Sequence, residues 1–125
     1  MKVSVIIPVF NKGKYIQNIL EDLHKQTLKD FECIVIDDGS TDCSGEICEQ
    51  FVAIDKRFKV IHTSNNGASH ARNLGIQISQ GEYITFIDAD DSVPKNYLEC
   101  LYEDLVHGGA DLSICRMTKL KRDTI

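Results

Sequence analysis

Three carboxylates stand within four positions at Asp88, Asp90 and Asp91, directly after the uncharged run of residues 83–87. Two ionised carboxylates ~4 Å apart repel by roughly 4 kcal/mol at an effective dielectric near 20. A hard divalent cation such as Mg²⁺ or Mn²⁺ relieves this repulsion, because carboxylate oxygens are its preferred ligands. The cluster therefore predicts a metal site at the end of a strand. The alternative is a solvated acidic loop that caps the next helix.

Composition limits the class of protein. The chain has 125 residues, of which 42% are hydrophobic and 26% charged, as in one ordinary globular domain. We expect no transmembrane segment, because no stretch approaches ~20 consecutive apolar residues. The net charge of −5 argues against a nucleic-acid-binding surface, which needs clustered Lys and Arg.

The cysteines are odd in number, irregularly spaced and without a C-x-x-C pair. They are Cys33, Cys43, Cys48, Cys100 and Cys115. This pattern predicts neither disulfides nor a zinc site and indicates a reducing cytoplasm, with most of the thiols buried. A basic tail at Lys119, Lys121 and Arg122 allows contact with the inner face of a membrane, although we favour a solvated tail.

Strand-like and helix-like patterns alternate along the chain. The predicted strands cover residues 2–9, 31–36, 58–62, 83–87 and 111–115. The residues at 83–87 are apolar enough to predict a strand buried on both faces. Helices are predicted between the strands, the first at about residues 14–26.

The later helices are predicted from apolar spacing, capping residues and glycines. The second follows Thr41 or Asp42 and has an apolar face of Ile47, Phe51 and Ile54. The third runs from Gly67 to Gly81, with small residues that allow close packing on the sheet. The fourth has Ser92 as its cap, Pro94 in its first turn and a stop at residues 108–109. Its predicted core residues are Tyr97, Leu98, Leu101 and Leu105.

Alternating strands and helices predict an α/β fold, with a mostly parallel sheet and helices on both faces. In such sheets ligands bind beyond the carboxyl ends of the strands, where the strand order reverses. Polar clusters follow three predicted strands, at residues 8–11, 37–38 and 88–91. We therefore expect these clusters to form one site.

Four segments follow one another along the chain: Pro8-Val9-Phe10-Asn11, Asp37-Asp38-Gly39-Ser40-Thr41-Asp42, Gly67 with Ala71-Arg72-Asn73 and Gly75, and Asp88-Ala89-Asp90-Asp91. In this order they resemble the signature of family 2 glycosyltransferases, which have the Rossmann-like GT-A fold. The resemblance covers residues 2–115. It implies that residues 1–125 are the nucleotide-sugar-binding part of a longer enzyme, with the catalytic base expected beyond Ile125.

The resemblance also implies roles for the acidic segment. Asp90 is expected to bind Mg²⁺ or Mn²⁺ that bridges the two phosphates of the donor. Asp88 is expected to contact the ribose or to assist the metal, and Ala89 lies between them against the nucleotide. Asp91 either completes the metal shell or caps the following helix.

The other segments are expected to bind the nucleobase of the donor. Asp38 is expected to accept a hydrogen bond from N3–H of a uracil, which would select UDP, whereas Asp37 is left open. Phe10 is either a core aromatic or, as we prefer, one wall of the base pocket, since Pro8 and Asn11 flank it.

Arg72 is expected near the nucleotide, because a guanidinium suits phosphate or a base edge. The alternative is a surface arginine paired with an acidic neighbour.

By this resemblance, the enzyme transfers a sugar from a UDP-sugar to a hydroxyl of a saccharide or lipid-linked acceptor, with inversion, as in cell-surface polysaccharide synthesis. Three alternatives stay open: a non-catalytic nucleotide-binding fragment, a signalling receiver domain and a dinucleotide-binding dehydrogenase. The receiver lacks support because no acidic pair follows the first strand. The dehydrogenase lacks support because G-x-G-x-x-G is absent. The sugar, the acceptor and the oligomeric state are not predicted.

Overall fold

A computed structural model of the chain describes residues 1–107, which form alternating strands and helices. The strands are β1 (Val3–Val9), β2 (Phe31–Asp38), β3 (Phe58–Thr63) and β4 (Tyr83–Phe86). The helices are α1 (Ile16–His24), α2 (Ser44–Ile54), α3 (Ala68–Ile78) and α4 (Tyr97–His107). The predicted alternation is thus confirmed. The predicted strand at 111–115 and the helix stop at 108–109 lie outside the described residues.

The four strands form one parallel sheet in the order β3-β2-β1-β4. Val3 of β1 is in register with Phe31 of β2 on one side and with Tyr83 of β4 on the other. The chain moves outward from β1 to β2 and β3, then crosses back to add β4 on the free side of β1. The strand order therefore reverses between β1 and β4, where ligands of open α/β sheets bind.

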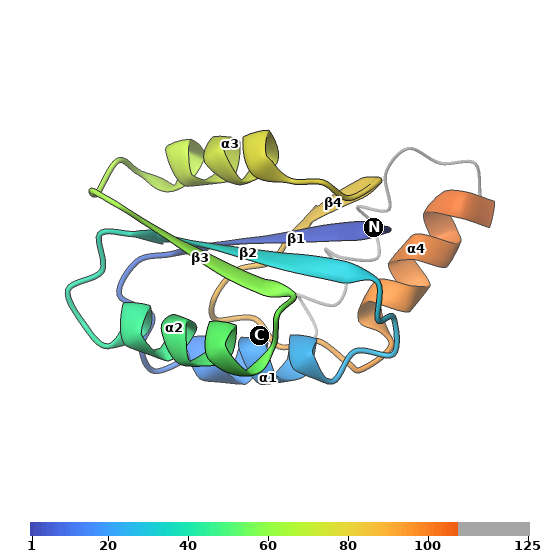
Figure 1. Cartoon of the computed structure of the whole chain (residues 1–125), viewed down its shortest axis with the longest axis horizontal. Coiled ribbons are helices and arrows are strands. Elements are labelled where there is room, and N and C mark those ends of the chain that lie inside the picture. Colours follow the sequence, from blue (N-terminus) through green and yellow to red (C-terminus); the bar gives the residue numbers. More distant parts are fainter. Residues whose placement is uncertain (108–125) are drawn as a thin grey trace.

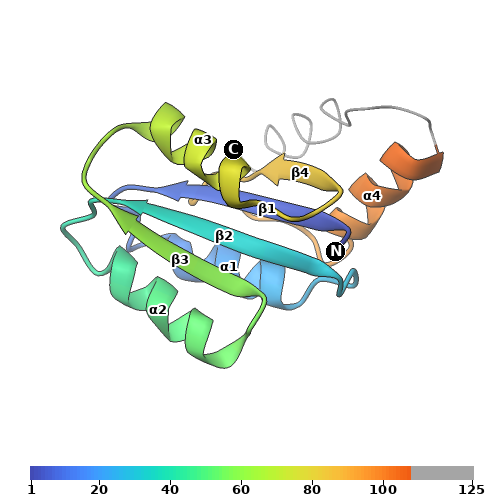
Figure 2. The same cartoon turned by 45° about the horizontal axis from the view of Figure 1, so that its top comes forward.

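Helices cover both faces of the sheet, as predicted: α1 and α2 lie on one face and α3 on the other (Figures 1 and 2). On the α1 side, Val5 and Ile7 of β1 belong to the larger core cluster. On the α3 side, Ile34 and Ile36 of β2 pack with Ala71. A Cβ at Gly75 would lie 2.5 Å from Cγ2 of Ile6, so this glycine lets α3 approach the sheet closely.

The prediction that the strand before the acidic segment is buried on both faces is wrong for the described residues. In β4 three of the four residues are only partly buried, whereas all eight residues of β2 are buried. The difference follows from sheet position. Among the described strands β4 has one neighbour, and β2 is flanked by β1 and β3.

Two helix predictions also need correction. In the predicted apolar face of α2, Phe51 is buried and Ile47 packs against the core, but Ile54 is 68% exposed. The other buried residues of α2 are Ser44 and Cys48. Helix α4 begins at Tyr97, so Ser92 and Pro94 lie in the preceding loop and neither caps nor opens it. The predicted core residues of α4 are buried at Tyr97, Leu98 and Leu101, and partly buried at Leu105.

The cysteines in the described part of the chain are all free thiols. Cys33 and Cys48 are buried, Cys100 is partly buried and Cys43 is exposed, so the expected burial holds for two of these four. Cys115 lies outside the described residues. Between residues 1 and 107, no helix has the length and apolar character needed to span a bilayer.

Candidate functional site

A cleft of about 410 Å³ opens at the carboxyl ends of β1, β2 and β4. Its lining is Pro8, Val9, Phe10, Lys12, Asp38, Ala68, Arg72, Asp88, Ala89 and Asp90. The lining includes every residue predicted for the nucleotide and the metal except Asn11. Segments that are up to about 80 positions apart in the sequence therefore meet at the predicted edge of the sheet.

The acidic segment forms a tight turn after β4. The Ile87 N–H donates to the Ile6 carbonyl (3.1 Å), which continues the pairing with β1 for one residue. The Asp91 N–H donates to the Asp88 carbonyl (3.0 Å), and the Asp88 N–H donates to Oδ2 of Asp91 (3.1 Å). This turn brings one carboxylate oxygen each from Asp88, Asp90 and Asp91 within 4.8 Å of one another. A set of carboxylate oxygens at this spacing fits a hard divalent cation.

Lys12 lies opposite this turn and was missed by the sequence reasoning. Its Nζ is 3.8 Å from Oδ2 of Asp90 and 6.0 Å from the centre of the Tyr15 ring. The available signal was its position two residues after Phe10, on the loop already assigned to the site. A lysine ammonium at this place is an attractive group for phosphate.

Asn11 holds the loop after β1 to the loop after β2. It has φ of +52°, a left-handed conformation that Asn tolerates better than most residues. Its N–H donates to Oγ of Ser40 (3.0 Å), and its Oδ1 accepts from the Thr41 N–H (2.8 Å). The side chain therefore faces the neighbouring loop, and Asn11 is not part of the cleft lining.

The rest of the Asp-Gly-Ser-Thr-Asp segment continues this loop pairing. The Lys12 N–H donates to Oγ of Ser44 (2.9 Å), and the Gly13 N–H donates to Oδ2 of Asp42 (2.9 Å). Oδ1 of Asp42 accepts from both the hydroxyl and the N–H of Ser44, and these bonds hold the pKa of Asp42 below its usual range. This segment thus orients the Lys12 backbone at the edge of the cleft.

Asp38 joins the end of β2 to the start of α3. Its Oδ1 accepts from the Thr63 hydroxyl (3.0 Å) and the Asn66 N–H (2.8 Å), and its Oδ2 accepts from the Gly67 N–H (2.8 Å). These donors, the Asn66 N–H first, hold the pKa of this carboxyl below its ordinary value, so it is ionised at neutral pH. A carboxylate has about four acceptor positions, so about one remains on Oδ2.

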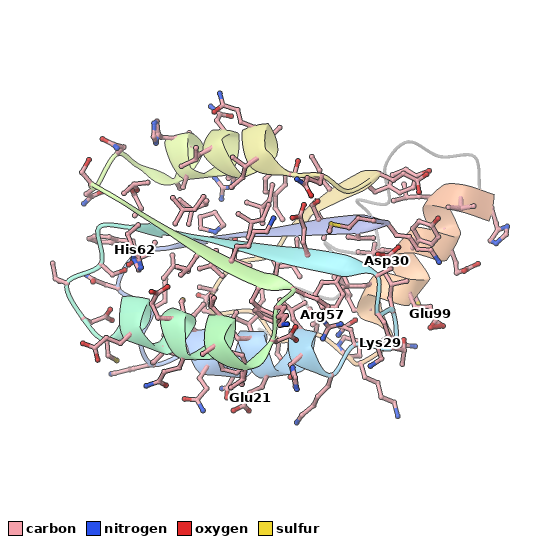
Figure 3. All side chains as sticks on the ribbon, viewed as in Figure 1. Glu21, Lys29, Asp30, Arg57, His62 and Glu99 are labelled. Carbon is pink, nitrogen blue, oxygen red and sulfur yellow. The ribbon has the colours of Figure 1, made fainter. Side chains whose placement is uncertain are left out.

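Asp37 faces away from the cleft, as alternation along a strand requires. Its Oδ2 is 2.8 Å from Nδ1 of His62, and its Oδ1 accepts from the Ser40 N–H (3.2 Å). Figure 3 shows His62 near the carboxyl end of β3. Asp37 lines a separate shallow pocket of about 590 Å³, so of the two adjacent aspartates only Asp38 belongs to the cleft.

Phe10 and Arg72 lie at the same cleft from different elements. Phe10 is 43% exposed at the end of β1, which excludes the core-aromatic alternative. Arg72 lies on α3 and is half-buried. Among residues 1–107, no carboxylate oxygen lies within 4.0 Å of the Arg72 guanidinium, so the alternative of a paired surface arginine is not supported.

Comparison with known proteins identifies the family. The family model of Glycosyl transferase family 2 matches residues 4–124. The chain belongs to this family. The match excludes the receiver and dehydrogenase alternatives. The chain is 46% identical over 113 residues to Glycosyltransferase GlyG of Streptococcus pneumoniae serotype 4, covering 90% of this chain and 38% of that protein.

Solved structures of glycosyltransferases share this fold. S. aureus TarS 1-349 in complex with UDP-GlcNAc superposes with a TM-score of 0.76 at 36% identity, covering 86% of this chain and 32% of that one. The mannosyltransferase PcManGT from Pyrobaculum calidifontis, in complex with GDP-Man and Mn²⁺, gives a TM-score of 0.79 at 23% identity, covering 84% and 32%. The predicted α/β, GT-A fold is thereby confirmed. The chain spans about a third of the length of these relatives.

Proposed function

We propose that this chain binds the UDP-sugar donor of a metal-dependent, inverting glycosyltransferase. The observation that carries the proposal is the meeting of Asp38, Arg72 and Asp90 in one cleft of about 410 Å³. A base acceptor, a guanidinium and a metal carboxylate are the groups that a pyrimidine nucleoside diphosphate requires. S. aureus TarS, a relative at 36% identity, has been solved with UDP-GlcNAc, which supports a UDP-sugar as donor.

The uracil base of the nucleotide is assigned to the end of the cleft at Asp38 and Phe10. Uracil presents N3–H between two carbonyl oxygens, and the acceptor position left on Oδ2 of Asp38 suits that donor. The exposed face of Phe10 offers a stacking surface, which is worth roughly 1–3 kcal/mol per base. Pro8 and Ala89 complete the apolar lining around the nucleoside.

The diphosphate is assigned to the end of the cleft near the acidic turn. The lining carries three carboxylates, at Asp38, Asp88 and Asp90, against two cations, at Lys12 and Arg72. This excess of negative charge repels a diphosphate unless a cation joins it. Mg²⁺ or Mn²⁺ held by Asp90 and Asp88 would neutralise the phosphates and stabilise charge on the UDP leaving group.

The transfer step itself needs a general base within hydrogen-bond reach of the acceptor hydroxyl. We assign this general base to none of residues 1–107. The described carboxylates that line the cleft are already assigned to the uracil, at Asp38, and to the metal, at Asp88 and Asp90. The acceptor, a saccharide or a lipid-linked sugar, is likewise assigned to parts of the enzyme outside the cleft described here.

Calorimetric titration of UDP with and without Mn²⁺ tests the proposal. We expect UDP to bind with Mn²⁺ present and Asp90→Ala to lose this binding by at least about tenfold, since a metal ligand is removed. Glu99→Ala is the control, because Glu99 is an exposed carboxylate on α4 (Figure 3). Unchanged UDP affinity in Asp90→Ala would refute the metal role of Asp90. Stronger binding of CDP than of UDP would refute the assignment of the uracil to Asp38.

A further inference from the structure

Gln26, just after α1, is a fully buried amide that meets the segment leading into α4. Its exposed fraction is 0%. Its Nε2 donates to the carbonyls of Pro94 (2.8 Å) and Asp22 (3.1 Å), and its Oε1 accepts from the Leu98 N–H (3.0 Å). A buried amide costs free energy unless it is hydrogen-bonded, so these bonds fix residues 94–98 against the end of α1.

Asp22 holds the beginning of the same segment. Its Oδ2 accepts from the Ser92 hydroxyl (3.0 Å) and from the Val93 N–H (3.1 Å). The Thr27 N–H adds a bond to the Lys95 carbonyl (2.8 Å). Asp22 near the end of α1, together with Gln26 and Thr27 just after it, thus forms hydrogen bonds to five of the seven residues in the segment 92–98. We call Asp22, Gln26 and Thr27 the α1 clamp.

The clamped segment begins at the residue after Asp91. On the other side of the acidic turn, the Ile87 N–H is bonded to the Ile6 carbonyl of β1. The four residues 88–91 therefore span the distance between two anchors, the sheet at Ile87 and the α1 clamp at Ser92. A four-residue turn between fixed ends has few conformations, so the clamp restricts where the carboxylates of Asp88, Asp90 and Asp91 lie.

We propose that Asp22 and Gln26 are positioning residues for the metal carboxylates, an inference that rests on the proposed function. Divalent metals require their oxygen ligands in defined places, and Mg²⁺ tolerates little departure from octahedral geometry. Groups hydrogen-bonded directly to metal ligands typically contribute 10–100-fold to metal affinity. Asp22 and Gln26 bond to the segment that follows the carboxylates, so their contribution should lie at or below the lower end of that range. Neither Asp22 nor Gln26 lines the cleft, so neither contacts the ion or the nucleotide.

Titration of Mn²⁺ alone, followed by the electron paramagnetic resonance signal of the free ion, tests this inference. We expect Asp22→Ala to weaken Mn²⁺ binding by up to about tenfold, the lower end of the range for groups that bond metal ligands directly. Ser92→Ala, which removes one of the two bonds to Asp22, should weaken it by a smaller factor. Glu21→Ala is the matched control, because the partly exposed Glu21 carboxylate on α1 accepts a bond from Gln17 within the same helix (3.0 Å).

A second measurement separates positioning from general destabilisation. Uridine binding, followed by nuclear magnetic resonance shifts, reports the base end of the cleft and should be unchanged in Asp22→Ala and Ser92→Ala. A purely structural role of the clamp predicts a lower Tm with Mn²⁺ affinity within twofold of the wild type, and that result overturns the inference. Equal loss of uridine and Mn²⁺ binding also overturns it.

The two proposals fail differently. If Asp90→Ala retains Mn²⁺ affinity, the metal site itself is wrong. If Asp90→Ala loses Mn²⁺ while folded Ser92→Ala and Asp22→Ala retain it, the metal site stands and the clamp has no positioning role. Ser92 is an exposed side chain, so Ser92→Ala keeps the test decisive even if Asp22→Ala fails to fold.

Discussion

The two ends of the parallel sheet use the same charged residue types in opposite ways. At the amino end, Glu32 is 1% exposed and accepts from the Ser4 hydroxyl (2.6 Å) and the Gln80 N–H (2.6 Å), with Lys59 Nζ at 3.0 Å. Also at this end, Asp55 accepts from Arg57 (2.7 Å). Each of these carboxylates accepts hydrogen bonds from other residues of the chain.

At the carboxyl end, three carboxylates meet one another. Asp88, Asp90 and Asp91 lie within 4.8 Å, and the side chain of Asp90 is 47% exposed, with Lys12 at 3.8 Å. Figure 3 shows the separation of the two ends, with Asp30 and Arg57 near the amino ends of the strands and His62 at the opposite end of β3. The carboxylates at the amino end are paired with donors of the chain, whereas the cluster at the carboxyl end is the place where we propose a divalent cation.

The largest expected effect is on stability and comes from the amino end. Glu32→Ala leaves the Ser4 hydroxyl and the Gln80 N–H without their acceptor and Lys59 without its partner. Because the Lys59 side chain is 47% exposed and can be solvated, the cost comes mainly from the two unsatisfied donors. We expect the free energy of unfolding, measured by urea denaturation, to fall by about 1–3 kcal/mol. UDP affinity, measured without urea on the folded variant, should be unchanged.

Glu21 provides the control, because its partly exposed carboxylate bonds only to Gln17 of its own helix in the described part of the chain. Glu21→Ala should stay within about 0.5 kcal/mol of the wild type. A loss of UDP affinity in Glu32→Ala, measured on folded protein, would show that the two ends of the sheet are not separable in the way described.

Asp38→Asn is expected to affect both stability and binding, because Asp38 belongs to the fold and to the cleft. The amide has one acceptor oxygen in place of two, so it cannot serve Asn66, Gly67 and a uracil together. We expect UDP binding to weaken by about tenfold, or 1.4 kcal/mol, and the preference for uridine over cytidine to fall, since an amide can donate to N3 of cytosine. Calorimetry with UDP and CDP measures both.

A stability loss in Asp38→Asn with an unchanged ratio of UDP to CDP affinity would restrict Asp38 to holding the turn at residues 66–67. Thr63→Ala is the matched variant, because it removes one bond to Asp38 and keeps the carboxylate.

The sequence predicted which residues converge at one edge of the sheet better than it predicted the packing of the fold around them. Asp38, Arg72 and Asp90 were placed in one cleft because the carboxyl ends of parallel strands converge, which is a matter of topology. Ile54 was placed wrongly because helical spacing alone does not say which side of a helix meets the sheet.

Lys12 and the α1 clamp were missed for a further reason. A lysine on a loop and a glutamine after a helix carry no pattern of their own. The Gln26 amide bonds to three partners, and two of them, Pro94 and Leu98, are 68 and 72 positions away in the sequence. Such contacts depend on the assembled fold, so a local reading of residues 22–27 cannot supply them.

Acid should weaken both ends of the sheet in the same direction. Hydrogen bonds hold the pKa of Asp38 and Asp42 below the ordinary value, and Arg57 does the same more strongly for Asp55. A lowered pKa in the folded state means that the unfolded chain binds more protons. This stability is therefore complete above about pH 4 and is lost as the pH falls through the folded-state values.

Urea denaturation between about pH 6 and pH 3 measures this dependence. The free energy of unfolding should fall below about pH 4, and the fall should be shallower in Asp38→Asn, which has no carboxyl to protonate at that position. An equally steep fall in that variant would mean that Asp38 is not held below its ordinary pKa.

The smallest expected effect comes from the ion pair that crosses the cleft. The side chains of Lys12 and Asp90 are 40% and 47% exposed, so the pair adds at most about 1 kcal/mol to stability. Lys12→Met should therefore leave the Tm nearly unchanged and shift binding in two directions. Mn²⁺ alone should bind a few-fold more tightly, because a competing cation leaves Asp90. UDP with saturating Mn²⁺ should bind a few-fold more weakly, because the diphosphate loses a cation.

Lys14→Met is the control, at an exposed lysine two residues further along the chain, and it should change neither affinity. If both affinities moved in the same direction, Lys12 would act through the shape of its loop and not through its charge.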